Sequence, residues 1–354
     1  MLQFLKGFKE RLFQSSADGS QTGDAGLWMK VAAVAFGLYA LAILILSVYW
    51  SSEPELFSVD AVAESYLPPQ QLRNEMVAGV PTTAALIQVV RTLLEKPGGY
   101  LSNDLAPPGV FLDNIPSWEY GALIQVRDLA RVLRESYSRS QSQSKEDEAL
   151  KSAEAQFNFN NKSWILPSSE EEYRQGLKGL EDYIARLVDQ DDQNAQFFTR
   201  ADNLRYWLAT VETRLGSLSQ NLSASVGQKR LNTDLAGDAK ASSATASADE
   251  VDVKTRWLEI DNVFYEARGS TWALIHFLKA AEIDFNDVLE NKNARVSLRQ
   301  IIRELEGAQQ AVWSPVILNG SGFGVLANHS LVMANYISRA NAAIIDLREL
   351  LERG

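Results

Sequence analysis

The chain has 354 residues, a formal net charge of −11 at pH 7 and no cysteine. The acidic balance disfavours nucleic acid as a partner, because phosphate backbones attract basic surfaces. The lack of cysteine excludes disulfides, zinc–thiolate sites and cysteine nucleophiles. A chain of this length buries a core without disulfides.

Residues 1–26 are predicted to form a cytoplasmic tail. The first thirteen, MLQFLKGFKERLF, place apolar side chains at helical spacing with basic residues between them. This pattern is typical of a short amphipathic helix on an anionic membrane surface. The alternative is a flexible tail whose charges only set the membrane orientation, since so short a helix is marginal in isolation.

Residues 27–50 are predicted to form a transmembrane helix. The uncharged apolar segment 31–49 covers about 28 Å as a helix, close to the thickness of a bilayer's hydrocarbon core. Trp28, Tyr49 and Trp50 flank it, as aromatic residues do at the headgroup layer. A cleaved signal peptide is disfavoured by the thirty residues before the segment and by its bulky C-terminal flank. A buried core helix is disfavoured because no face is polar.

The charges beside this segment predict its orientation. Four basic residues precede it, and the first basic residue after it is Arg73. Because Lys and Arg are retained on the cytoplasmic side, the N-terminus is expected inside and residues 51–354 outside. In a bacterium this describes a single-pass inner-membrane protein with a periplasmic domain.

Helical periodicity dominates the rest of the chain, and no strand-like alternation of useful length occurs. Apolar residues recur every three or four positions in the segments 82–96, 123–133, 145–155, 173–187, 197–222, 257–288, 298–312 and 333–351. The fold class is therefore all-α, with one transmembrane helix followed by an elongated or bundled helical domain outside the cytoplasm.

Local signals refine these boundaries. Thr82 or Thr83 is expected to cap the first helix, and Ser168 with Glu171, or Ser169 with Glu172, forms a capping box. The apolar stripe shifts phase after DQDDQN at 189–194, which indicates two helices or one long helix with a displaced stripe. 

Residues 223–250 have little apolar content and no period. They are predicted to be a disordered connector between two helical regions, 51–222 and 251–354, that pack together.

Residues 96–121 differ from the rest in combining prolines, glycines and aromatic rings. The segment is too apolar for a linker, so we expect an ordered loop. Its exposed rings would suit recognition; alternatively, they plug the end of the helical bundle. The candidate interaction surface consists of Tyr100, Phe111, Leu112, Trp118 and Tyr120.

No catalytic, cofactor or metal site is predicted. His276 and His329 lack a partner at metal-ligand spacing and are expected to be structural. The NGSGFG segment, 319–324, follows a helix and is expected to be a connector, not a phosphate loop. Asp104, Asp113 and Glu119 fall in the aromatic segment, where burial can create a general acid; turn and helix-end roles are the favoured alternative.

The runs PGGYLSNDLAPPGVFLDNIPSWEYGALIQVRDLAR and FNFNNKSWILPSSEEEY resemble a family of proteobacterial single-span membrane proteins designated only as a domain of unknown function. The resemblance covers most of the chain after residue 50. It implies a Gram-negative inner-membrane protein with a periplasmic domain, and it implies no activity or catalytic residue.

Two function classes follow. The favoured one is a scaffold or interaction module of the cell envelope, whose partners are the lipid bilayer and other envelope proteins or a second copy. The alternative is an envelope enzyme of the glycan-cleaving type, with its site in residues 96–121.

Overall fold

The computed structural model describes residues 22–68, 76–140, 145–189, 194–231, 250–314, 316–321 and 324–353. The chain forms two compact units, Met1–Trp50 and Ser51–Gly354, which are described separately. The amphipathic helix predicted in the first thirteen residues lies outside the described residues.

The described part of the first unit is helix α2 (Thr22–Trp50). In the described part of the chain it is the one helix long and apolar enough to cross a membrane. Its side chains from Leu27 onward are almost all exposed and include no polar face. The helix begins at Thr22, before the predicted residue 27.

The second unit, Ser51–Gly354, is called the helical domain. It is built almost entirely of helices, which confirms the all-α prediction. In chain order the elements are α3 (Val59–Glu64), α4 (Val80–Glu95), the 3-10 turn η1 (Gly109–Phe111), α5 (Asn114–Val132), the π-helical turn η2 (Leu133–Tyr137), α6 (Glu148–Phe157), α7 (Ser169–Val188), α8 (Ala201–Ser223), η3 (Ala224–Val226), β1 (Gln228–Leu231), β2 (Glu250–Val253), η5 (Trp257–Glu259), α9 (Ile260–Asp284), α10 (Asn286–Asn291), α11 (Arg295–Ala308) and α12 (His329–Glu352).

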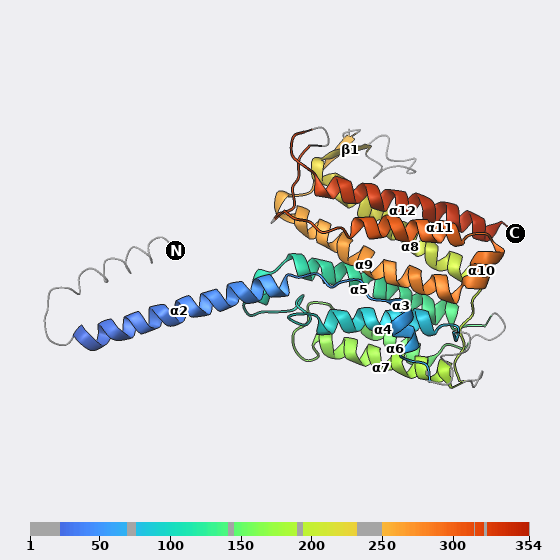
Figure 1. Ribbon diagram of the computed structural model, residues 1–354, viewed down its shortest axis with the longest axis horizontal. Coiled ribbons are helices and arrows are strands. Elements are labelled where there is room, and N and C mark those ends of the chain that lie inside the picture. Colours follow the sequence, from blue (N-terminus) through green and yellow to red (C-terminus); the bar gives the residue numbers. More distant parts are fainter. Residues whose placement is uncertain are drawn as a thin grey trace, which may run out of the picture. The chain divides into compact units, whose positions relative to one another are not determined.

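Helices α5 and α9 form the centre of the helical domain and lie side by side (Figure 1). They run in the same direction, since Trp118 near the start of α5 contacts Trp272, and Tyr137 just beyond its end contacts Phe285. Helices α4, α6 and α7 cover one side of this pair, and α8, α11 and α12 cover the other. The end of the domain where α5 and α9 begin is called the proximal end, and the opposite one the distal end.

Apolar stripes at helical spacing produce this core, as the sequence predicts. Leu208 of α8 and Leu278 of α9 are fully buried, and so are the rings of Trp118, Trp207 and Trp272. The phase shift after residue 189 separates two helices, α7 and α8. Of the alternatives left open by the pattern, two separate helices is therefore correct.

Helix α7 begins as predicted, with the Ser168 hydroxyl accepting from the Glu171 amide at 3.3 Å. Helix α4 does not begin with a threonine cap. Its N-cap is Gly79, at φ +87°, and the cap is supplied by the Asp284 carboxylate of α9. This carboxylate accepts from the Gly79 amide at 2.7 Å and from the Thr82 amide at 2.9 Å.

The segment 223–250 contains structure at both ends. Strands β1 and β2 pair antiparallel, with Gln228 opposite Val253 and Leu231 opposite Glu250. The predicted absence of strands is therefore corrected by a two-stranded ribbon, which is too short to show a period in the sequence. Residues 232–249 of the predicted connector lie outside the described residues.

Candidate functional site

The predicted loop 96–121 is a loop only to residue 113, because α5 begins at Asn114. Pro116 lies in the first turn of α5. A proline there does not break a helix, since first-turn amides have no intrahelical acceptor. Residues 114–121 of the predicted loop are thus helical.

A buried ion pair anchors this loop. Lys96 Nζ lies 2.5 Å from Glu119 Oε1, and both side chains are almost completely shielded from solvent. Glu119 also accepts from the Leu101 and Ser102 amides, each at 2.8 Å, and from the Ser102 hydroxyl. Burial raises the pKa of Glu119, and the Lys96 ammonium opposes that rise. The loop therefore wraps around a carboxylate that is enclosed, not open to a substrate.

Tyr100 and Trp118 belong to the core. The Tyr100 ring packs edge-on against Tyr173 with centroids 5.6 Å apart, and its hydroxyl donates to the Asn161 carbonyl at 3.1 Å. Trp118 packs against Trp272 at 5.0 Å. Both rings are buried, so these two residues are not accessible to a partner.

The other three candidates remain accessible to different degrees. Phe111, in η1, is 68% exposed, Leu112 is half-buried, and Tyr120 is exposed on the flank of α5. Tyr120 borders a shallow groove of about 400 Å³ that Ser102 and Glu266 also line. Because successive helical residues are about 100° apart, α5 directs Trp118 inward and Tyr120 outward. The five predicted residues therefore do not form one surface.

The three candidate carboxylates do not form an acid–base pair in an open cleft. Glu119 is enclosed as described, while Asp113 is exposed at the N-cap of α5. Asp104 is half-buried, and burial together with the nearby Glu170 raises its pKa. Of the turn and helix-end roles that the sequence favoured, Asp113 has the helix-end position, whereas Glu119 instead holds the loop through a buried ion pair.

His276 is a structural residue. Its Nδ1–H donates to the Trp272 carbonyl at 2.8 Å, its Nε2 accepts from the Phe57 amide at 3.1 Å, and its ring stacks on that of Phe57. His329 begins α12, and its Nδ1 accepts from the Leu318 amide at 3.1 Å. Among the described residues no group of three or more His, Asp or Glu side chains is placed to hold a metal ion.

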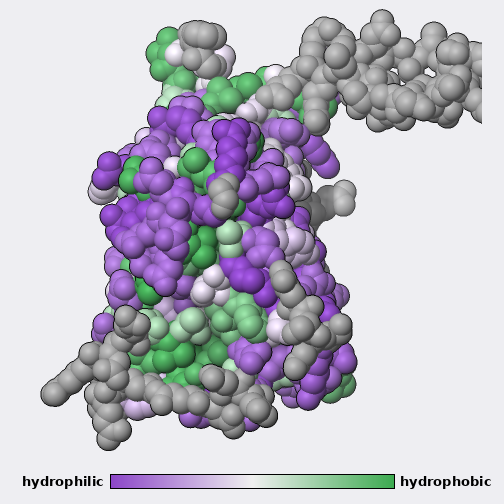
Figure 2. Space-filling view, turned by 90° about the vertical axis from the view of Figure 1, so that its right-hand side faces the viewer, coloured by the Kyte–Doolittle hydropathy of each residue, from purple (hydrophilic) through white to green (hydrophobic). Residues whose placement is uncertain are grey.

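The distal end contains a pocket with a volume of about 950 Å³. Figure 2 shows this end: hydrophilic residues cover most of it, and an apolar area lies in its lower half. The pocket is lined by the charged Lys279, Glu282, Asp284 and Arg299 and by apolar residues such as Met76. Burial raises the pKa of Asp284 to about 6, against the hydrogen bonds by which it caps α4.

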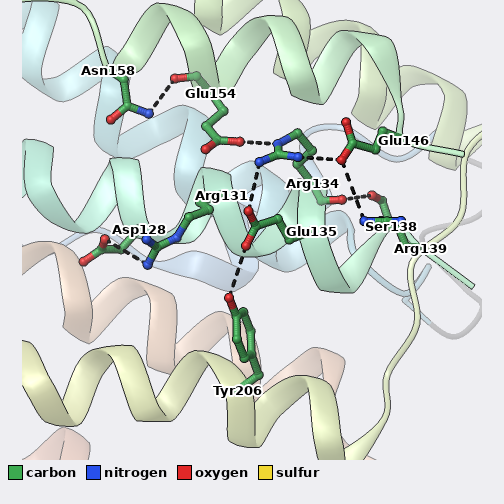
Figure 3. Close-up of polar contacts among 10 residues, drawn as sticks. All are labelled: Asp128, Arg131, Arg134, Glu135, Ser138, Arg139, Glu146, Glu154, Asn158 and Tyr206. Atoms are coloured by element: carbon green, nitrogen blue, oxygen red, sulfur yellow. Dashed lines mark hydrogen bonds and ion pairs between the residues drawn. The ribbon is translucent and has the colours of Figure 1, made fainter. Parts of the chain in front are cut away.

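A second polar cluster surrounds the π-helical turn η2 (Figure 3). Arg134 contacts three carboxylates, those of Glu135 at 3.0 Å, Glu146 at 2.6 Å and Glu154. The Tyr206 hydroxyl donates to Glu135 at 3.1 Å. The cluster thus links η2 to α6 and α8. Pockets of about 610 and 470 Å³ border it, and its ion pairs act as a clamp between helices.

The chain was compared with known families, curated proteins and solved structures. The family described as "Uncharacterized protein conserved in bacteria (DUF2333)" matches residues 22–354. The chain belongs to this family. No curated protein and no solved structure matches it. The DUF2333 match includes both α2 and the helical domain, and it confirms the resemblance seen in the sequence.

Sequence reasoning missed several of the polar groups that organise this DUF2333 domain. Asp284 caps a helix that begins some two hundred residues earlier, and Arg134 binds Glu154 of α6 and Glu146 of the segment before α6. No local motif identifies either residue, because their partners are brought together only by the tertiary fold. The one available signal was that Asp284 is an acidic residue on the otherwise apolar stripe of α9.

The buried imidazole predicts a pH dependence of stability. Burial lowers the pKa of His276 to about 3 from its ordinary value of 6.5. A depressed pKa gives a contribution that is fully present above about pH 6.5 and is lost as the pH falls toward 3. We therefore expect the difference in free energy of unfolding between the native protein and His276→Gln to become smaller as the pH falls from about 6.5 toward 3. The decrease is up to about 1.4 kcal/mol per pH unit.

The measurement is urea unfolding of both proteins in a mild detergent from pH 4 to 8, followed by circular dichroism. Asp284 has a raised pKa, so its contribution is present at low pH and is lost as the pH rises through about 6. Because both proteins contain Asp284, comparing them isolates the imidazole. A gap that does not change with pH would contradict the buried neutral state of His276.

Proposed function

We propose that this protein is a bitopic scaffold of the bacterial cell envelope. Helix α2 crosses the inner membrane, the short N-terminal tail lies in the cytoplasm, and the helical domain lies in the periplasm. The length and apolar character of α2 support the span, and the basic residues before it support the orientation. An acidic domain without cysteine suits an extracytoplasmic location.

The observation that supports the scaffold role is the burial of the candidate catalytic carboxylate. Glu119, the carboxylate most suited to acid catalysis by position, is sealed against Lys96 and the loop backbone. The flank of the domain exposes the groove beside Tyr120, which Glu266 also lines, and Arg214 lies nearby. An exposed tyrosine between groups of opposite charge is typical of a protein-binding surface. We propose another envelope protein or a second copy as its occupant.

One experiment tests orientation and partner together. The chain has no cysteine, so Ser16→Cys, Tyr120→Cys and Tyr206→Cys each place a single thiol. Spheroplasts are treated with a membrane-impermeant maleimide that carries a photoreactive group, and are then irradiated. We expect labelling at positions 120 and 206 but not 16, and a covalent protein adduct from position 120.

Tyr206 is the matched control, because it is also an exposed helical tyrosine but lies near the distal start of α8. Labelling at 16 without labelling at 120 would reverse the orientation. Adducts of equal yield from 120 and 206, or none from either, would contradict the proposed protein-binding surface.

A further inference from the structure

The chain enters the helical domain at its proximal end. Glu53 pairs with Arg268 of α9 at 2.7 Å. Two residues later the Glu55 carbonyl accepts from the Trp272 indole, and two residues further on the Phe57 amide donates to His276. The segment therefore runs along α9 in the direction of that helix, and Ser51 lies beside its beginning.

Several loops from distant parts of the sequence gather at the same end. The Asn103 side chain donates to the Ser163 carbonyl at 2.7 Å, which joins loop 96–113 to loop 158–168. The Asn319 side chain donates to the Ser225 carbonyl at 3.0 Å, and the Thr255 amide to the Ala224 carbonyl. The segment from 309 to 328 is held there as well, since Arg268 donates to the Gln310 carbonyl.

These loops project large apolar side chains into solvent. Phe111 is 68%, Leu166 90%, Trp257 79% and Trp313 95% exposed. Each belongs to a different loop of the proximal end, and three of them have an exposed apolar neighbour: Val110 beside Phe111, Ile165 beside Leu166 and Leu258 beside Trp257. At the distal end, by contrast, Val296 at 77% is the large apolar residue with comparable exposure among the described residues, while Tyr206 is 46% exposed.

Tryptophan shows the same division. Trp118, Trp207 and Trp272 are buried in the core, and Trp28 and Trp50 flank the apolar segment of α2. The remaining three, Trp164, Trp257 and Trp313, are all exposed on proximal loops. Exposure of three indoles, at 57% to 95%, is costly in water and favourable in the headgroup layer of a bilayer, where amphipathic rings concentrate.

The short connection between α2 and the helical domain limits how far the proximal end can lie from the membrane. Glu53 is already bound to the helical domain, and it follows Trp50 by three residues, which reach at most about 10 Å. If α2 spans a bilayer, as the proposed function requires, the proximal end cannot leave the membrane surface by more than a short distance. The apolar tips lie on separate loops and form no single groove, which suits shallow insertion better than a protein ligand.

We propose that the proximal end of the helical domain rests on the bilayer and inserts these loop tips into the outer part of the leaflet. The contact is mainly apolar, because these loops carry no basic excess: their basic residues Lys162, Lys254 and Arg256 are offset by acidic ones, among them Asp104, Asp113, Asp252 and Glu259. Two anchoring elements, the span and the loop tips, hold the domain in one orientation. The Tyr120 flank then faces sideways, where a protein partner has access to it.

The test uses single-cysteine variants of the full chain, purified and reconstituted into vesicles of phosphatidylethanolamine and phosphatidylglycerol. Leu166→Cys and Trp313→Cys report on the loop tips, and Val296→Cys is the control, with 77% exposure at the distal end. Each thiol carries an environment-sensitive fluorophore. Nitroxide-labelled lipids and aqueous iodide then measure contact with lipid and with water.

At positions 166 and 313 we expect blue-shifted emission, quenching by nitroxide lipid several-fold stronger than at 296, and weak quenching by iodide. Iodide quenching equal to that at 296 would show that the tips stay in water and would overturn the proposal. Protection from both quenchers would indicate a protein contact between copies and would overturn it too.

Failure here is distinguishable from failure of the proposed function. The vesicles contain no other protein, and the domain is tethered to the leaflet on its own side whichever way α2 inserts. If the tips remain in water but position 120 gives a protein adduct in spheroplasts, only the proposed lipid contact is contradicted. If the tips insert but position 120 gives no adduct, only the proposed protein-binding role is contradicted.

Discussion

Replacing Gly121 or Gly269 by alanine is expected to destabilise the helical domain by about 3 kcal/mol, and valine at either position to prevent folding. These two glycines lie where α5 and α9 come closest. A Cβ atom at Gly121 would stand 1.9 Å from the Glu266 carbonyl oxygen, and one at Gly269 would stand 1.8 Å from the Trp118 carbonyl oxygen. No side-chain rotation removes either clash, because both obstacles are backbone atoms.

The two contacts are reciprocal. Trp118 and Gly121 are one turn apart on α5, and Glu266 and Gly269 are one turn apart on α9, so each helix fits its glycine against the other's carbonyl. Relief of one clash requires the helices to separate along their whole contact. Separation would open space around the buried Trp118–Trp272 ring contact, and a cavity in such a core costs further stability.

The matched control is Gly216→Ala in α8. The nearest atom to a Cβ there is the Asn341 side-chain nitrogen at 3.7 Å, which is an ordinary contact. Alanine is the better helix former, so this variant should be about 0.5 to 1 kcal/mol more stable than the native protein. Urea unfolding in a mild detergent, followed by circular dichroism, measures all of these variants. Loss of stability below about 1 kcal/mol at both 121 and 269 would disprove the close crossing.

This crossing shows what the sequence predicts and what it does not. Apolar residues at three- and four-residue spacing predicted the helices, because that spacing alone places them on one face. The same reasoning gave the Ser168 cap, whose partner is three residues away. The pairing of α5 with α9 joins segments some 145 residues apart, and no periodic pattern encodes it. Glycines in a helical pattern were uninformative until their neighbours were known.

The aromatic segment was only partly predictable for the same reason. Its composition correctly indicated an ordered loop, since so many rings and prolines do not suit a linker. The role of each ring depended on where α5 begins. With Asn114 as its first residue, Trp118 turns into the core and Tyr120 turns outward. Composition cannot assign neighbouring residues to opposite faces without that boundary.

Removal of either member of the Lys96–Glu119 pair is expected to destabilise the domain by about 3 to 5 kcal/mol, because it leaves an uncompensated buried charge. Glu119→Ala should have the larger effect. It strands the Lys96 ammonium and also deprives the Leu101 and Ser102 amides of their acceptor. The loop that these amides fix should then lose its protection against proteolysis.

The exposed pair of Arg186 with Asp182 provides the control. Its atoms are 3.0 Å apart, but the Asp182 side chain is 61% exposed, so Asp182→Ala should cost less than about 1 kcal/mol. The double variant Lys96→Met with Glu119→Leu should be less destabilised than the sum of its single variants, since no charge is left unpaired. Strict additivity would mean that the two groups do not interact.

Lys96→Met should make stability depend on pH in a defined direction. Burial already raises the pKa of Glu119 above its ordinary 4.5, and the ammonium opposes this rise. Without the ammonium the pKa rises further, so the folded state binds a proton that the unfolded state releases. A raised pKa contributes stability that is present below about pH 4.5 and is lost as the pH rises. The variant should therefore be closer to native stability at pH 5 than at pH 8, and unfolding at the two pH values measures this. An equal loss of stability at pH 5 and pH 8 would show that Glu119 is already neutral when paired with Lys96. The contact between them would then be a hydrogen bond without ionic character.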